Sequence, residues 1–176
     1  LSVHGAIGVQ YFKLSSREIA EFITTCLIVV LCSTFLLTVL VLGLSSILTS
    51  ITKLPLDWLV VGVLLAGIQA VGLIRLTLWQ VAGQPFTYGS FQFFQTLANG
   101  LLSLFLVLIV GLAWQGRLIG QGLALTSFGI LSIYFLYQDN FLVHPNNFLV
   151  HLRKALKFGI PLIPHAIGAL IVLSAD

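Results

Sequence analysis

Long apolar stretches separated by a few charged residues dominate the hydropathy pattern of the chain. No charged residue lies between Glu21 and Lys53, and a membrane-crossing helix needs about 20 apolar residues. The pattern therefore predicts a helix over Phe22–Leu44. A second apolar stretch predicts a helix over Trp58–Leu78.

The stretch 76–116 has no charged residue and is too long for one membrane crossing. Gly83, Gln84 and Pro85 supply the residue types of a turn. A third helix is therefore predicted over Tyr88–Trp114 and a fourth over Arg117–Gln138, followed by a loop over residues 140–147.

The composition supports this division. The chain has 176 residues, of which 59% are hydrophobic and 7% charged, with a mean hydropathy of +1.11. A soluble domain has about 25% charged residues, so these values exclude a soluble enzyme, a disordered tail and a nucleic-acid-binding module. The net charge of +3 is too small to indicate a nucleic-acid partner. We predict an all-α, polytopic transmembrane helix bundle.

Lys and Arg residues alternate between the two ends of the predicted helices. Six fall at one end and two at the other, and the cation-rich loops of a membrane protein face the cytoplasm. The expected cytoplasmic side holds Lys13, Arg17, Arg75, Arg153, Lys154 and Lys157, and the opposite side holds Lys53 and Arg117. Trp58, Trp79 and Trp114 lie at predicted helix ends, where amphipathic rings favour the membrane interface.

Both ends of the chain fall inside apolar stretches. Residues 1–12 have the pattern of the tail of an earlier helix, and residues 158–175 begin another. We therefore expect a central fragment of a larger polytopic protein. The segment before this last stretch predicts a short basic amphipathic helix on the cytoplasmic surface. Its apolar face is predicted to contain Phe148, Leu149, Leu152, Leu156 and Phe158.

Arg75 is the first candidate functional residue, because a charge inside a membrane helix is costly and often functional. Two interpretations stay open at this stage. The side chain can extend to the head groups from near the helix end, or it can line a hydrated cavity. Gln69 and Gln80 lie six residues before it and five after it, so the three residues do not share one helix face.

Gln92, Gln95 and Asn99 follow one another at spacings of three and four, which places them on one face of the third helix. They either form hydrogen bonds between helices or form a polar wall of a cavity. Gly116, Gly120 and Ala124 form a stripe of small residues, which predicts close helix packing.

The remaining chemistry-bearing residues give weak signals. Cys26 and Cys32 point to different sides of a helix and are expected to be packing residues. His4, His144, His151 and His165 are scattered along the chain and show no pairing with a carboxylate at ligand spacing. We predict no metal, no cofactor and no catalytic residues, because no nucleophile motif or paired carboxylates occur.

The C-terminal residues resemble a known family. After a basic segment the chain reads Gly-x-Pro-x-x-Pro and then Ser-x-Asp, formed by Gly159, Pro161, Pro164, Ser174 and Asp176. This order is similar to the start of the seventh helix of bacterial lipid-linked oligosaccharide flippases. These flippases belong to the multidrug/oligosaccharidyl-lipid/polysaccharide exporter superfamily.

A second segment, 66–107, resembles the fourth and fifth helices of the same family. Family members place a basic residue before a Gly-x-Pro loop and a Tyr at the beginning of the next helix. Arg75, Gly83, Pro85 and Tyr88 occur in that order. Residues 5–12 resemble the end of the second helix.

The resemblance implies a two-lobed, MATE-like transporter fold. Residues 1–138 would supply most of the N-terminal lobe, from the end of helix 2 through helices 3–6. Residues 139–158 would form a cytoplasmic loop with a basic amphipathic linker, and residues 159–176 would begin helix 7 in the second lobe.

The function that the resemblance implies is translocation of polyprenyl-diphosphate-linked oligosaccharides across the bacterial cytoplasmic membrane, without catalysis. Arg75 would bind the diphosphate, and Gln69, Gln95 and Asn99 would bind the sugars. The expected partners are this lipid-linked substrate, membrane lipids, and a polysaccharide polymerase and chain-length protein.

Two alternatives stay open. A drug/cation antiporter of the same superfamily would need acidic residues within its spans, and the middle of the four predicted spans has none. A membrane-embedded polysaccharide polymerase or ligase would need a large basic external loop, and the loops around Lys53 and Arg117 are short.

Overall fold

The computed structural model describes residues 3–159 and 161, and this part of the chain consists of helices and connecting turns without strands. In chain order the elements are α1 (Val3–Gln10), α2 (Ser16–Gly43), α3 (Ser45–Thr52), α4 (Leu56–Val81), α5 (Pro85–Leu104), a π-helical turn (Phe105–Ile109) and α6 (Ala113–Gln138). A further helix over residues 148–159, called the linker helix below, follows an extended segment.

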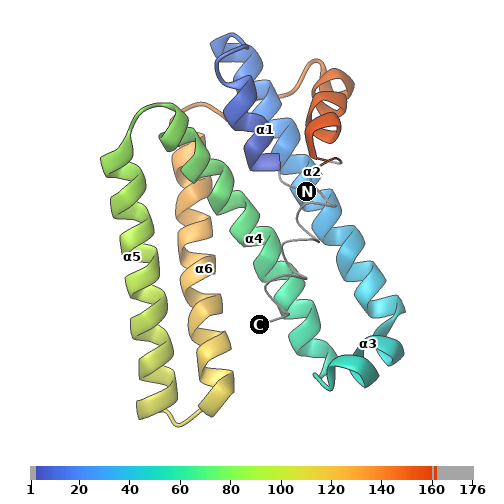
Figure 1. Cartoon of the computed structure of the whole chain (residues 1–176), viewed down its shortest axis with the longest axis vertical. Helices are drawn as coiled ribbons and strands as arrows, with labels where there is room; N and C mark the ends of the chain where they lie inside the picture. Colours follow the sequence, from blue (N-terminus) through green and yellow to red (C-terminus); the bar gives the residue numbers. More distant parts are fainter. Residues whose placement is uncertain (1–2, 160, 162–176) are drawn as a thin grey trace.

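The four predicted spans are confirmed as helices that are long and apolar enough to cross a membrane. They are α2, α4, α5 with its π-helical turn, and α6. The helices alternate in direction, so that α2 begins and α6 ends at the same end of the bundle (Figure 1). We call this end, near Lys13 and Arg17, the basic end.

The turn between α4 and α5 forms where the sequence predicts it. Gly83 has a φ of +68°, a left-handed conformation that glycine adopts without steric cost. Pro85 then occupies the first turn of α5, where its missing N–H leaves no hydrogen bond unmade.

The second turn differs from the prediction. The third span was expected to reach Trp114, but it ends at Ile109, and α6 begins at Ala113 rather than at Arg117. Gly111, with a φ of +76°, permits this turn inside an uncharged sequence. Ala113 also has a positive φ, of +46°. The charge positions therefore placed this boundary wrongly, because no charged residue marks the turn.

The apolar core lies towards the basic end of the bundle. It joins α1, the first half of α2, the second half of α4, the end of α6 and the linker helix. Its fully buried side chains include Ile7, Phe22, Ile23, Ile74 and Leu136. Towards the opposite end, large apolar side chains such as Leu31 and Phe35 are exposed, as expected for surfaces that face lipid.

Trp58 and Trp114 lie in the first turns of α4 and α6, at helix ends as predicted. Their rings lie at the opposite end, with ring centroids 5.5 Å apart. Trp79 lies near the end of α4, as predicted, but it is buried. It forms a second small core with Leu76 and Phe91.

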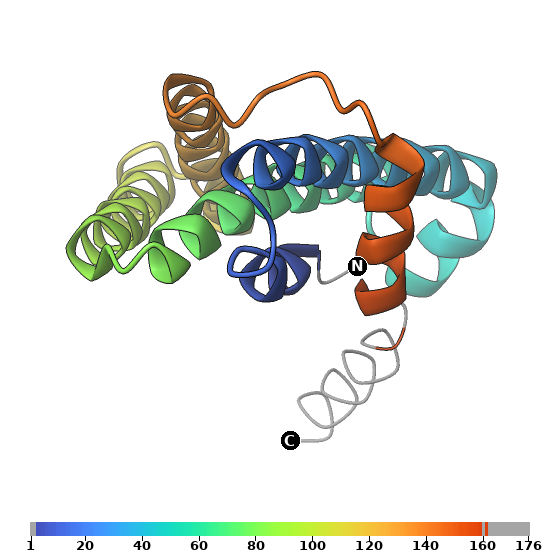
Figure 2. The same ribbon diagram turned by 90° about the horizontal axis from the view of Figure 1, so that it is seen from above.

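The linker helix packs onto the bundle through only part of its predicted apolar face. It packs beside α1 and against α2 (Figure 2), and it buries His151 and Ala155. Leu149, predicted to belong to the apolar face, is 76% exposed. Leu152 and Phe158 of the same predicted face do pack against the core, so the predicted face is only partly the one that makes the tertiary contacts.

The stripe of small residues on α6 allows α5 to approach closely, as predicted. A Cβ atom added to Gly120 would lie 2.6 Å from the backbone nitrogen of Ser103. A Cβ atom added to Gly116 would lie 3.0 Å from the carbonyl carbon of Leu106. Both glycines are therefore required by the distance between the two backbones.

Gly120→Ala should destabilise the chain by about 1–3 kcal/mol, because α5 and α6 must separate to accommodate the methyl group. Gly100→Ala is the matched control on α5, since no atom lies within 4 Å of its added Cβ. The readout is the fraction of detergent-solubilised protein that stays monodisperse after heating. Equal losses for both variants would contradict this account of the packing.

Candidate functional site

Arg75 is buried near the basic end of α4. The residue is 4% exposed, so its guanidinium is enclosed within the bundle, which disfavours the interpretation in which the side chain extends to the head groups. Its Nη2 donates a hydrogen bond of 2.5 Å to Oδ2 of Asp139, just after α6. The guanidinium also lies over the ring of Trp79, with Cζ 4.3 Å from the ring centroid.

Each partner compensates part of the cost of burying this cation. Asp139 neutralises its charge, and the π face of Trp79 attracts it electrostatically. The Arg75 Nε atom is buried without a hydrogen-bond partner among the described residues. The Asp139 side chain is 45% exposed, whereas that of Arg75 is 5% exposed.

A pocket of about 320 Å³ lies beside the pair. Its polar lining comes from Tyr11, Arg75, Gln84 and Asp139, and Trp79 and Phe141 are among its apolar lining residues. The pocket joins the end of α1, the turn after α4 and the segment after α6. It can therefore bind a small anionic group beside a fixed cation.

The three amides predicted to act with Arg75 lie elsewhere. Gln69 is exposed on α4, and Gln95 is half-buried on α5. Asn99 is also half-buried, and its Oδ1 accepts a hydrogen bond of 3.3 Å from Ser103 within α5. None of the three lines the pocket beside Arg75.

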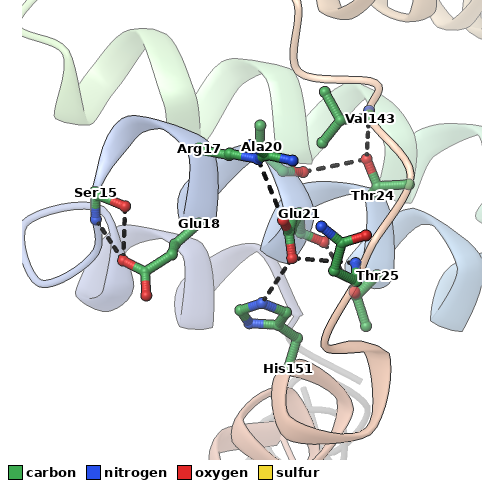
Figure 3. Close-up of polar contacts among 10 residues, drawn as sticks. Ser15, Arg17, Glu18, Ala20, Glu21, Thr24, Thr25, Val143 and His151 are labelled. Atoms are coloured by element: carbon green, nitrogen blue, oxygen red, sulfur yellow. Dashed lines mark hydrogen bonds and ion pairs between the residues drawn. The ribbon is translucent and has the colours of Figure 1, made fainter.

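A second polar cluster joins α2 to the segment that leads to the linker helix (Figure 3). The hydroxyl of Thr24 donates to the carbonyl of Phe141 at 3.0 Å and accepts the N–H of Val143 at 3.2 Å. The Oε2 atom of Glu21 accepts the N–H of Asn146 at 3.2 Å. These bonds fix the extended segment where it crosses α2 (Figure 2).

Glu21 and His151 meet in this cluster. Their Oε2 and Nε2 atoms are 3.6 Å apart, and their side chains are 7% and 4% exposed. From the sequence, Glu21 marked only the boundary of a span and His151 had no paired carboxylate, so this contact corrects both expectations. The signal that could have indicated this pair is the position of Glu21, a carboxylate at the sixth residue of a long apolar helix.

The beginning of α2 is stabilised by local hydrogen bonds. The carboxylate of Glu18 accepts the backbone N–H of Ser15 at 3.0 Å and its hydroxyl at 2.7 Å. This arrangement satisfies groups that have no partner within the helix. It holds the start of α2, and with it Glu21, in a defined position.

The fold defines the class of protein: an all-helical chain with four helices that are long and apolar enough to cross a membrane. Comparison with known proteins adds no family, because no protein-family model, no curated protein and no solved structure matches the chain.

Asp139→Asn should destabilise the protein by about 1–3 kcal/mol, because it leaves the buried Arg75 guanidinium without an anionic partner. A double variant, Arg75→Met with Asp139→Asn, should recover most of this loss, since no buried charge then remains. Thermal unfolding in detergent measures both effects. The matched control is Asp57→Asn at an exposed position; an equal loss there, or no recovery in the double variant, would contradict the importance of the pair.

Proposed function

We propose that the chain is part of a flippase that moves polyprenyl-diphosphate-linked oligosaccharides from the cytoplasmic to the outer leaflet by alternating access. The observation that carries this proposal is the buried Arg75, a fixed cation beside a polar pocket at the basic end of the bundle. The order of Arg75, Gly83, Pro85 and Tyr88, together with Gly159 and Pro161, supports the choice of family through its resemblance to these flippases.

The transport task explains why a buried cation would be useful. A lipid-linked oligosaccharide carries a diphosphate and polar sugars that hydrocarbon does not solvate, while its lipid tail stays in the bilayer. The diphosphate would compete with Asp139 for the Arg75 guanidinium. Because Asp139 is half-exposed, its carboxylate can move into water when the substrate displaces it, and no bond needs to be made or broken.

The three amides have a smaller role in this proposal than the sequence suggested. Gln69 is exposed, and Gln95 and Asn99 are partly exposed on a different helix. Contacts of these amides with sugars would require a surface extending over α4, α5 and α6 rather than the pocket beside Arg75. Arg75 is therefore the residue on which the proposal is tested.

One observation favours a second candidate, a drug/cation antiporter of the same superfamily. Such a protein needs an acidic residue within its spans, and Glu21 is a buried carboxylate in α2. It lies near the basic end of the helix rather than in its middle, and it already contacts His151. We therefore keep the flippase as the first proposal.

Deleting the gene that encodes this chain should leave complete lipid-linked oligosaccharides on the cytoplasmic face of the membrane. The measurement is protection of the oligosaccharide from a membrane-impermeant glycosidase added to spheroplasts. Unjoined units at the outer face would instead indicate a polymerase or ligase. An unchanged lipid pool would contradict both the flippase and the polymerase or ligase, and would favour the drug/cation antiporter.

Arg75→Ala should reduce export by about 10- to 100-fold when it replaces the wild-type protein at equal membrane level, because a charge-assisted contact to phosphate is lost. Arg75→Lys should retain part of the activity. Arg117→Ala removes an exposed cation at the opposite end and should leave export unchanged. Normal export by Arg75→Ala would show that Arg75 does not bind the substrate.

The proposed orientation places the basic end in the cytoplasm. In a variant with Cys26→Ala and Cys32→Ala, a cysteine replacing the exposed Gln115 should react with an impermeant maleimide added to spheroplasts. A cysteine replacing the exposed Asn147 should react only after the membrane is permeabilised. The reverse pattern would invert the orientation and with it the direction of transport.

A further inference from the structure

Glu21 and His151 combine burial, proximity and unused hydrogen-bonding capacity. Both side chains are more than nine-tenths buried, and the 3.6 Å between Oε2 and Nε2 is longer than a hydrogen bond. Neither ring nitrogen of His151 has a hydrogen-bond partner among the described residues. A buried polar ring in this state is costly, and an apolar side chain would fill the same volume without that cost.

The surroundings of the pair contain few other charges. Arg17, on the same helix, places Nε 3.7 Å from Oε1 of Glu21, but its side chain is 81% exposed. Glu18 and Lys154 lie close enough to affect each other electrostatically, and Glu18 also lies within reach of His151. The half-buried His4 lies on α1, and the exposed His144 lies on the segment before the linker helix.

The two residues also lie at a mechanical junction. Glu21 is in α2, and its Oε2 atom accepts the N–H of Asn146 just before the linker helix. His151 is in the first turns of the linker helix and packs its ring edge-on to Phe22 at 6.0 Å between centroids. A change of charge at either residue therefore acts directly on the contact between the linker helix and α2.

We propose that Glu21 and His151 form a proton-binding site that controls the docking of the linker helix on α2. With His151 protonated and Glu21 ionised, opposite charges face each other and the helix is held. Loss of the proton from His151 leaves a buried carboxylate opposite a neutral ring. Protonation of Glu21 leaves a buried imidazolium without its anion. Docking is therefore strongest at intermediate pH and weaker on both sides.

The test is hydrogen–deuterium exchange of residues 148–159 in the whole chain reconstituted in lipid nanodiscs. Rates corrected for the intrinsic pH dependence of exchange are compared across the pH range in which carboxylates and imidazoles titrate. Protection should pass through a maximum and fall by about tenfold or more at each side, as expected for an unpaired buried charge.

Two variants separate the two sides of this profile. His151→Gln should abolish the dependence at the alkaline side, and Glu21→Gln should abolish it at the acid side. His144→Gln is the matched control, because it removes an exposed histidine seven positions before His151 and should leave the maximum intact. A flat profile in the wild-type protein, or an unchanged maximum in both pair variants, would overturn the proposal.

A second measurement keeps the proposal testable if the variants do not fold. Nuclear magnetic resonance of the wild-type chain with ¹⁵N-labelled histidine reports directly on the protonation of each imidazole. One ring should titrate together with the exchange protection of the linker helix. If every imidazole titrates without any accompanying change in that protection, no proton site controls the docking.

Discussion

Hydrocarbon offers no hydrogen-bonding partner, and this constraint determines how the polar groups of the chain are arranged. Hydroxyl groups along the long helices donate to carbonyls of their own helix, as Thr34 does to Val30 at 2.8 Å and Ser132 does to Phe128 at 2.8 Å. The charged groups that enter the bundle collect near one end, where partners from several elements reach them. The burial of Arg75 depends on Asp139, and the burial of Glu21 depends on Asn146 and His151.

The same constraint separates the two ends of the bundle. Near the basic end, α2 and α4 are covered by α1, α6 and the linker helix, and the core is continuous. Towards the opposite end the same helices expose Leu31 and Phe35. The polar pocket and the Glu21–His151 pair both belong to the covered end, where close packing supplies the fixed geometry that specific binding needs.

Local features of the sequence were sufficient to predict the helices and one turn. Apolar length identifies the four spans, and Gly83 with Pro85 identifies the turn between α4 and α5. The end of the third span was misplaced, because no charged residue marks the turn that contains Gly111 and Ala113. The stripe that contains Gly120 predicted close packing, because helical spacing is itself a local property.

The candidate site was less predictable, because its pairs join residues that are distant in sequence. Arg75 was recognisable as an unusual charge, but its partner Asp139 follows two helices later. His151 has no sequence neighbour that indicates Glu21 as its contact. Trp79 was expected at the membrane interface, but it is buried in a small core. The partners of an aromatic ring depend on tertiary packing, which the local sequence does not reveal. Such pairs between distant residues become visible only once the fold is known.

The order in which these partners are made has a consequence for biogenesis. Glu21 enters the membrane with α2, whereas Asn146 and His151 are translated only after α6. At about 5–20 residues per second, the carboxylate waits on the order of ten seconds for its contacts. The contacts that bury Glu21 are therefore complete only after synthesis has passed His151, so a chain that ends after α5 has a Glu21 carboxylate without them.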